Sequence, residues 1–71
     1  MKTKKSYSLQ IFAKGEEQPF SLQVFTSSSV DVAKRLSRQV FLAHGDLADH
    51  AKLFDLSSVD APEHGLLILE L

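Results

Sequence analysis

The residues with the most chemical character lie near the middle of the chain. His44, Asp46, Asp49 and His50 carry imidazole and carboxylate groups, which are common ligands of metals such as zinc. A typical helical metal site has two histidines four residues apart on one helix face, and the chain has no such pair. We therefore expect the two aspartates to cap or solvate a turn, His44 to cap a helix, and no metal to bind.

Nucleophilic and phosphate chemistry also lack their usual motifs. The chain has nine serines and three histidines, but no serine lies in the Gly-x-Ser-x-Gly turn that positions a nucleophile. The three glycines are isolated, so no glycine-rich loop could hold a phosphate group. The sequence therefore predicts a non-enzymatic protein with no catalytic residue, no cofactor and no small-molecule substrate.

The size of the chain agrees with this expectation. Its 71 residues, 44% of them hydrophobic, suffice for one small domain with one core. The charged fraction of 24% is ordinary for a globular protein, and without cysteine no disulfide supports the core. We expect a single domain at residues 6–71, preceded by a disordered basic tail at residues 1–5.

The formal net charge of -1 is unevenly distributed along the chain. Residues 1–45 carry seven Lys or Arg against three acids, whereas residues 46–71 carry one Lys against six acids. A solvated helix face and a basic tail explain this excess, but the same groups could bind nucleic acid, and that alternative stays open. Its candidate residues are Lys2, Lys4, Lys5, Lys34, Arg35 and Arg38.

No targeting feature is visible in the sequence. No apolar run is long enough to cross a membrane, and the N-terminal residues lack the apolar centre of a signal peptide. We therefore expect a cytoplasmic protein with no membrane partner.

Two alternating segments predict a β-hairpin at the start of the domain. Apolar and polar residues alternate over residues 7–14 and again over 20–26, with a polar turn between them. The inner face of this hairpin is expected to carry Leu9, Ile11, Leu22 and Val24. The outer face is mainly Ser and Gln, apart from Phe12 and Phe25, which could stack on nucleic-acid bases.

One helix should follow the hairpin. Ser28 with Asp31 resembles a capping box at its start, and His44 followed by Gly45 is typical of a helix end. Between these signals, apolar residues recur at three- and four-residue steps opposite the basic residues, so this stripe should pack on the hairpin. The stripe consists of Val30, Ala33, Leu36, Val40 and Phe41.

The remainder of the chain is less regular. Residues 46–58 fit either a second helix or a short strand at 51–56, and periodicity does not decide between the two. Residues 59–65 contain a proline and a glycine and are expected to form a loop. The nearly continuous apolar run at 66–71 predicts a last strand in a central position of the sheet, covered on both faces.

In this order the elements, and several residues within them, resemble the ubiquitin-like (β-grasp) superfamily. The similar stretches are Leu9–Lys14 and Phe20–Val24 for the first two strands, Ser28–Leu36 for the helix start, Gly45–Leu53 for the entry to the third strand, and Leu67–Leu69 for the last strand. The resemblance implies an α+β fold in which a mixed sheet of about four strands packs on one helix. The predicted core consists of Leu9, Ile11, Leu22, Val24, Val30, Leu36, Val40, Leu67 and Leu69.

Two departures from the family limit what the resemblance implies. Nine residues lie between Leu56 and Leu66, roughly half of the family's usual length at this point, so a short fourth strand should be reduced or missing. No Gly-Gly tail follows the last strand. Covalent conjugation through the C-terminus is therefore not expected.

The resemblance also implies a function, because ubiquitin-like modules bind partner proteins through an apolar sheet face. Phe54 falls where the family carries the isoleucine at the centre of that face. With Leu67 and Leu69 turned to the helix, other large apolar side chains would lie on an outer face that this short chain cannot cover. We expect this face to bind an unidentified protein partner or a second copy of the chain. Its anchors are predicted to be Phe12, Phe25, Phe54, Leu66 and Ile68.

Overall fold

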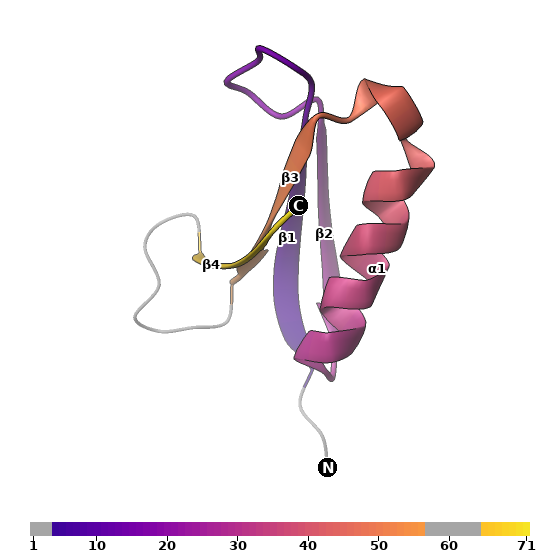
Figure 1. Ribbon diagram of the computed structural model, residues 1–71. Coiled ribbons are helices and arrows are strands. Elements are labelled where there is room, and N and C mark those ends of the chain that lie inside the picture. Colours follow the sequence, from indigo (N-terminus) through magenta and orange to yellow (C-terminus); the bar gives the residue numbers. More distant parts are fainter. Residues whose placement is uncertain (1–3, 57–64) are drawn as a thin grey trace.

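The computed structural model describes residues 4–56 and 65–71. It is an α+β domain with one main helix and a four-stranded sheet (Figure 1), as the sequence predicts. The elements are β1 (Lys5–Phe12), β2 (Ser21–Ser27), α1 (Val30–Ala43), the 3-10 helix η1 (Gly45–Leu47), β3 (His50–Asp55) and β4 (Leu66–Glu70). Residues 46–56 of the ambiguous segment thus contain one short helical turn followed by a strand, and its last two residues lie outside the described ones. Residues 59–64 of the expected loop lie outside the described residues.

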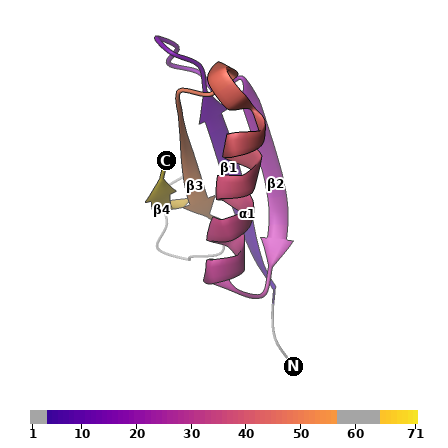
Figure 2. The ribbon, with the colours of Figure 1, turned by 45° about the vertical axis from the view of Figure 1, so that its right-hand side comes forward.

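All strand pairings in the described sheet are antiparallel. The strand order is β2-β1-β3-β4, so β1 and β3 are central and β4 lies at an edge (Figure 2). The predicted mixed sheet and central last strand are therefore wrong. The apolar run of β4 has another cause. A register shift opposite Leu53 and Phe54 lets the adjacent residues Ile68 and Leu69 both pack against the core.

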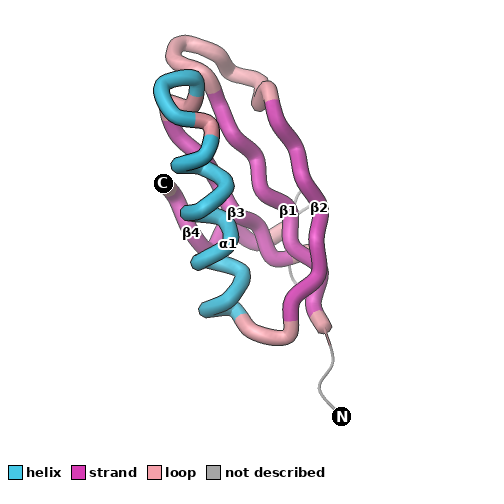
Figure 3. Tube along the Cα trace, turned by 90° about the vertical axis from the view of Figure 1, so that its right-hand side faces the viewer, coloured by secondary structure: helices cyan, strands magenta, loops and turns pink. Residues whose placement is uncertain are grey.

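The core lies between α1 and the sheet face that α1 covers (Figure 3). Its buried apolar side chains come from the two central strands and the helix, and they are Tyr7, Leu9, Ile11, Ala33, Ala51 and Leu53. The alternation predicted for β1 is confirmed. α1 meets the sheet through the small residues Ala33 and Ser37, and the buried Ser37 hydroxyl donates a hydrogen bond of 2.8 Å to the Ala33 carbonyl.

β2 turns to the core the face opposite to the predicted one. Its register places Phe25 beside Tyr7 and Gln23 beside Leu9, and directly opposite residues on neighbouring strands share a face. The rings of Tyr7 and Phe25 stack with their centroids 5.7 Å apart. Leu22 and Val24, both predicted core residues, are 60% and 64% exposed on the other face. Because β2 carries apolar residues on both faces, its register with β1 decides which face is buried.

Three more residues of the predicted core are exposed: Val30, Leu36 and Leu67. In α1, the contact through Ala33 and Ser37 turns Leu36 to the flank of the helix, since successive residues are about 100° apart. Leu67 lies opposite Phe54, on the sheet face that α1 does not cover. Val40 and Leu69 pack partly buried against the core, as expected.

The two ends of α1 differ in how closely they follow the sequence signals. The N-cap is Ser29 and not Ser28, because the Ser29 side chain accepts a hydrogen bond from the Val32 N–H at 3.5 Å. The Ser27 hydroxyl supports this turn by donating to the Ser29 carbonyl at 2.9 Å. The C-terminal end is as predicted, since His44 is the C-cap and Gly45 adopts a φ of +61°.

Candidate functional site

The sheet face away from α1, called the outer face below, is not covered by any described helix or strand (Figures 1 and 2). Strand registers fix which side chains share it. Gln10 lies between Leu22 and Lys52, and one step along the sheet Ser8 lies between Val24 and Phe54. The outer face therefore mixes polar and apolar side chains, as a surface open to solvent on one side of an antiparallel sheet commonly does.

A hollow with a volume of about 440 Å³ lies on the outer face below the β1–β2 hairpin loop. It is called the outer hollow below. Its lining residues are Gln10, Phe12, Glu17, Gln18, Pro19, Leu22, Lys52 and Phe54. The loop above it is held to the helix end, because the Phe20 ring packs edge-on against His44 with centroids 5.3 Å apart. Three strands and one loop thus contribute to one concave surface.

Phe12 lies on the outer face but is only 6% exposed, because its neighbours cover the ring. The His50 ring stacks parallel to it, with centroids 4.6 Å apart and an interplanar angle of 3°. The Lys52 Nζ lies 5.5 Å from the centre of the same ring, within the range of a cation–π contact. The Asp49 Oδ2 lies 2.9 Å from the His50 Nδ1. Phe12 therefore supports the surface and offers little contact area of its own.

The outer hollow combines an apolar wall with groups of both charges. Leu22 and Phe54 can contact an apolar side chain, while Lys52 and Glu17 can pair with charged groups beside it. Gln10 and Gln18 add amide donors and acceptors. Such a surface suits a protein segment that carries one apolar anchor among polar residues.

The structure brings together two of the five predicted anchors. Phe12 and Phe54 both line the outer hollow. Phe25 and Ile68 do not lie on the outer face, because both pack against the core, so their predicted placement on that face is wrong. Leu66 is exposed, but it lies opposite Asp55, on the same side of the sheet as Leu53 and not on the outer face.

Sequence reasoning missed Leu22, Lys52 and the loop residues of the outer hollow. The signal for Lys52 was present, since it alternates with the buried residues Ala51 and Leu53. Leu22 was assigned to the wrong face of its strand. The loop residues had no signal of their own, because their place depends on how the hairpin folds over the sheet.

The basic residues of the alternative function that the structure describes form no aromatic-lined surface. Lys5 begins β1 and pairs with Ser27, and Lys4 directly precedes the strand. This end of β1 lies at the same end of the molecule as the start of α1 (Figure 1), and Lys2 lies outside the described residues. Arg35 and Arg38 are exposed on α1, and Lys34 is partly buried there. Phe12 is covered and Phe25 packs against the core, so the predicted exposure of these two rings together on the outer face is wrong.

Tyr7 and Asp55 form a buried polar pair of residues on the core side of the sheet, where they lie opposite each other on β1 and β3. Burial raises the pKa of the Tyr7 phenol above its usual value of 10.0, and the Asp55 carboxylate raises it further. The phenol is therefore neutral near pH 7. Its place beneath α1 makes it part of the core and not of the outer hollow.

Comparisons with protein-family models, curated proteins and solved structures found no match to this chain. The ubiquitin-like resemblance therefore rests on the residues quoted from the sequence. Among residues 4–56 and 65–71, no three His, Cys, Asp or Glu side chains are grouped closely enough to hold a metal ion. No helix in the described part of the chain is both long and apolar enough to cross a membrane.

Proposed function

We propose that this chain is a non-enzymatic interaction module that binds a partner protein non-covalently through the outer hollow. The observation that carries the proposal is the concave surface itself. It places the exposed Leu22 and the partly buried Phe54 beside Lys52 and Glu17, on a sheet face that no described helix or strand covers. Interfaces commonly combine an apolar centre with a polar rim of this kind.

The ubiquitin-like resemblance supports the same mode of binding. Phe54 occupies the position that resembles the centre of that family's partner-binding face, and Phe54 lines the outer hollow. The proposed use of the sheet face needs no reactive C-terminus. It also needs no catalytic group, in agreement with the chemistry expected from the sequence.

Affinity capture with matched variants tests this function. The bait is the full chain, and the variant Phe54→Ser removes the apolar wall of the outer hollow. Leu42→Ser is the control, because Leu42 is 73% exposed on α1, which covers the opposite face of the sheet from the hollow. We expect the wild type and Leu42→Ser to retain the same protein, and Phe54→Ser to bind it about tenfold more weakly or worse. Circular dichroism shows whether both variants fold.

Two results would contradict the proposal. A folded Phe54→Ser variant that retains the partner as well as the wild type would exclude the outer hollow as the site. Binding to single-stranded oligonucleotides that weakens steeply with salt, and is lost when Lys34, Arg35 and Arg38 are replaced by Ala, would favour the nucleic-acid alternative instead.

A further inference from the structure

We propose that a second copy of this chain pairs with β2 edge to edge, so that two sheets continue as one. β2 pairs with β1 on one side, and within residues 4–56 and 65–71 no strand pairs with its other side. A free edge presents backbone N–H and C=O groups to any strand that can approach it. The backbone edge of β2 is not part of the outer hollow, although the Leu22 side chain borders both, so the inference goes beyond the proposed function.

β2 lacks the features that usually keep a free edge from pairing. Such edges commonly carry charges, prolines or bulges. All seven residues of β2 are uncharged and none is proline, in a chain of which 24% of the residues are charged. The other edge of the described sheet differs, because β4 carries Glu70 and the register shift beside Phe54. The unprotected edge is therefore the β2 side.

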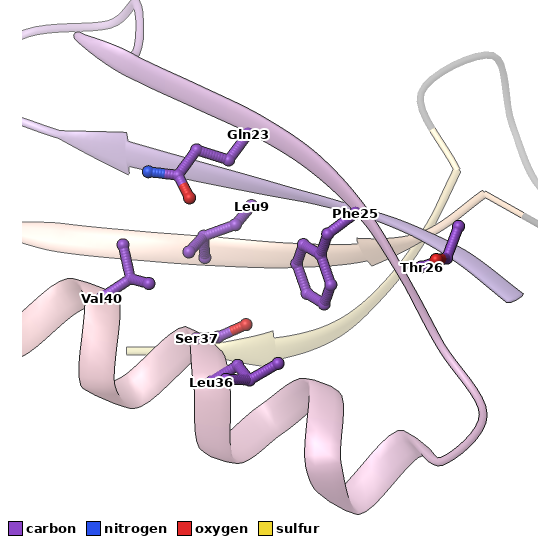
Figure 4. A pocket seen from close by; sticks show the side chains of 7 residues that line it. All are labelled: Leu9, Gln23, Phe25, Thr26, Leu36, Ser37 and Val40. Carbon is purple, nitrogen blue, oxygen red and sulfur yellow. The ribbon is translucent and has the colours of Figure 1, made fainter. Parts of the chain in front are cut away.

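One flank of α1 extends this uncharged strip. Leu36 lines a cavity together with Phe25 and Thr26 of β2 (Figure 4), so the Leu36 flank faces the β2 side of the molecule. With about 100° between successive helix residues, this flank consists of Val32, Leu36, Gln39 and Ala43. The charged residues of α1 project from its other sides. Leu36 is 41% exposed, so the flank offers apolar surface beside the free edge.

The cavity itself opens to the surface between β2 and α1. Its volume is about 250 Å³, and Leu9, Phe25, Leu36 and Val40 give it mainly apolar walls (Figure 4). Removing apolar surface from water is favourable, so a molecule seated at the β2 edge gains free energy by covering this cavity. A second copy brings its own β2 and its own Leu36 flank to the same place.

The strand is complementary to itself. An antiparallel pairing of all seven residues is centred on Val24, which then faces the Val24 of the second copy. Leu22 faces Thr26 on the outer face, and Gln23 faces Phe25 on the helix face, so no charged or proline residue enters the pairing. The two-fold axis of this arrangement is perpendicular to the sheet, so both helices lie on the same face and their Leu36 flanks approach each other. These features identify a second copy as the occupant.

The oligomeric state of the full chain tests the proposal. By sedimentation or light scattering, we expect twice the monomer mass of 7.9 kDa at high concentration, with dissociation on dilution. Val24→Lys should return the mass to that of the monomer, because two ammonium groups would face each other at the centre of the pairing. Leu42→Lys introduces the same charge at an exposed site away from β2 and should remain dimeric. A monomeric wild type, or a folded Val24→Lys variant that stays dimeric, would overturn the proposal.

If Val24→Lys does not fold, the rate of disulfide formation between two copies tests the pairing instead. The chain has no cysteine, so Val24→Cys carries a single thiol. In the symmetric pairing the two Cα atoms lie about 4.5–5.5 Å apart, within the range of about 4.4–6.8 Å that a disulfide spans. Val24→Cys should therefore form a linked dimer at least about tenfold faster than Leu42→Cys under mild oxidation. Equal rates for the two variants would contradict the pairing.

The two proposals can fail independently. Phe54 lies in the outer hollow and not at the β2 edge, so Phe54→Ser should lose the partner protein and keep the dimer mass. A chain that binds its partner but stays monomeric would remove the edge pairing alone. A dimer that shows no dependence on Phe54 for partner binding would remove the proposed function alone.

Discussion

Gly65 lies at a close backbone contact. It precedes β4 and has a φ of +94°, a conformation that residues other than glycine rarely adopt. A Cβ at this position would lie 2.9 Å from the Asp55 carbonyl oxygen and 2.9 Å from the Leu56 Cδ2. The end of β3 and the entry to β4 can therefore approach this closely because residue 65 has no side chain.

We expect Gly65→Ala to lower the free energy of unfolding by about 1–3 kcal/mol, from backbone strain together with the clash. Gly15→Ala is the matched control. Gly15 has a φ of +79° but nothing within 4 Å of an added Cβ, so it carries the strain without the clash. Urea denaturation of both variants should show the larger loss for Gly65→Ala. Equal losses would mean that the contact with Asp55 relaxes at no cost.

Tyr7 couples stability to alkaline pH. Burial and, second, Asp55 raise the pKa of its phenol above 10.0, so the folded chain holds this proton more tightly than the unfolded chain. The stabilisation that the protonated Tyr7 phenol contributes is complete below pH 10, and it is lost as the pH rises through the pKa of the folded chain. The chain has one tyrosine and no tryptophan, so phenolate absorbance reports Tyr7 alone. We expect its titration midpoint to be higher in the folded chain than in denaturant, and Tyr7→Phe to lessen the alkaline loss of stability. Identical midpoints would refute this coupling.

Among the strands, the choice of which β2 face is buried has the clearest effect on stability. Leu22 and Ile11 were both expected in the core, but Ile11 is buried and Leu22 is exposed. Ile11→Val should therefore lower the free energy of unfolding by about 0.5–1.5 kcal/mol, although it removes only one methylene group. Leu22→Ala removes more atoms, but its free energy of unfolding should stay within about 0.5 kcal/mol of that of the wild type. Chemical denaturation would compare the two, and a greater loss for Leu22→Ala would mean that β2 buries its other face.

The same strand shows which parts of the fold could be predicted from the sequence. The alternation of Tyr7, Leu9 and Ile11 and the stop at Gly45 depend on local geometry, and the structure confirms both. The inward face of β2 and the edge position of β4 depend on which strands pair, and at what register. A pattern within one segment does not contain that information, so both predictions were wrong.

The candidate site was predicted only in part, because strand register also decides which side chains share the outer face. Alternation within β1 placed Phe12 on the outer face, and the ubiquitin-like resemblance pointed to Phe54. Phe25 was misplaced with its strand, and Ile68 was misplaced because the register shift in β4 is not visible in the sequence. The hollow is lined by residues of three strands and the hairpin loop, so no pattern within a single segment predicts it.

Within residues 4–56 and 65–71, the packing of α1 against one face of the sheet leaves much apolar surface exposed. The fold has two layers, and α1 covers a single face of the sheet (Figure 3). Of a chain that is 44% hydrophobic, residues such as Leu22, Val24, Leu42 and Leu47 remain exposed on different sides. Exposed apolar groups that lie together on a monomer commonly mark interaction surfaces, which is why the outer hollow and the β2 edge carry the two proposals.

The position of β2 at the edge of the sheet also determines how many binding sites the dimer would present to a partner. Two-fold pairing through β2 presents two outer hollows on the same side of one continuous sheet, so the dimer is bivalent. A partner that displays two matching segments could engage both hollows, and the avidity would exceed the affinity of a single hollow by about 10²–10⁴. The bound fraction of such a partner would then rise steeply over the concentration range in which the chain dimerises. The two hollows need not contact each other for this effect.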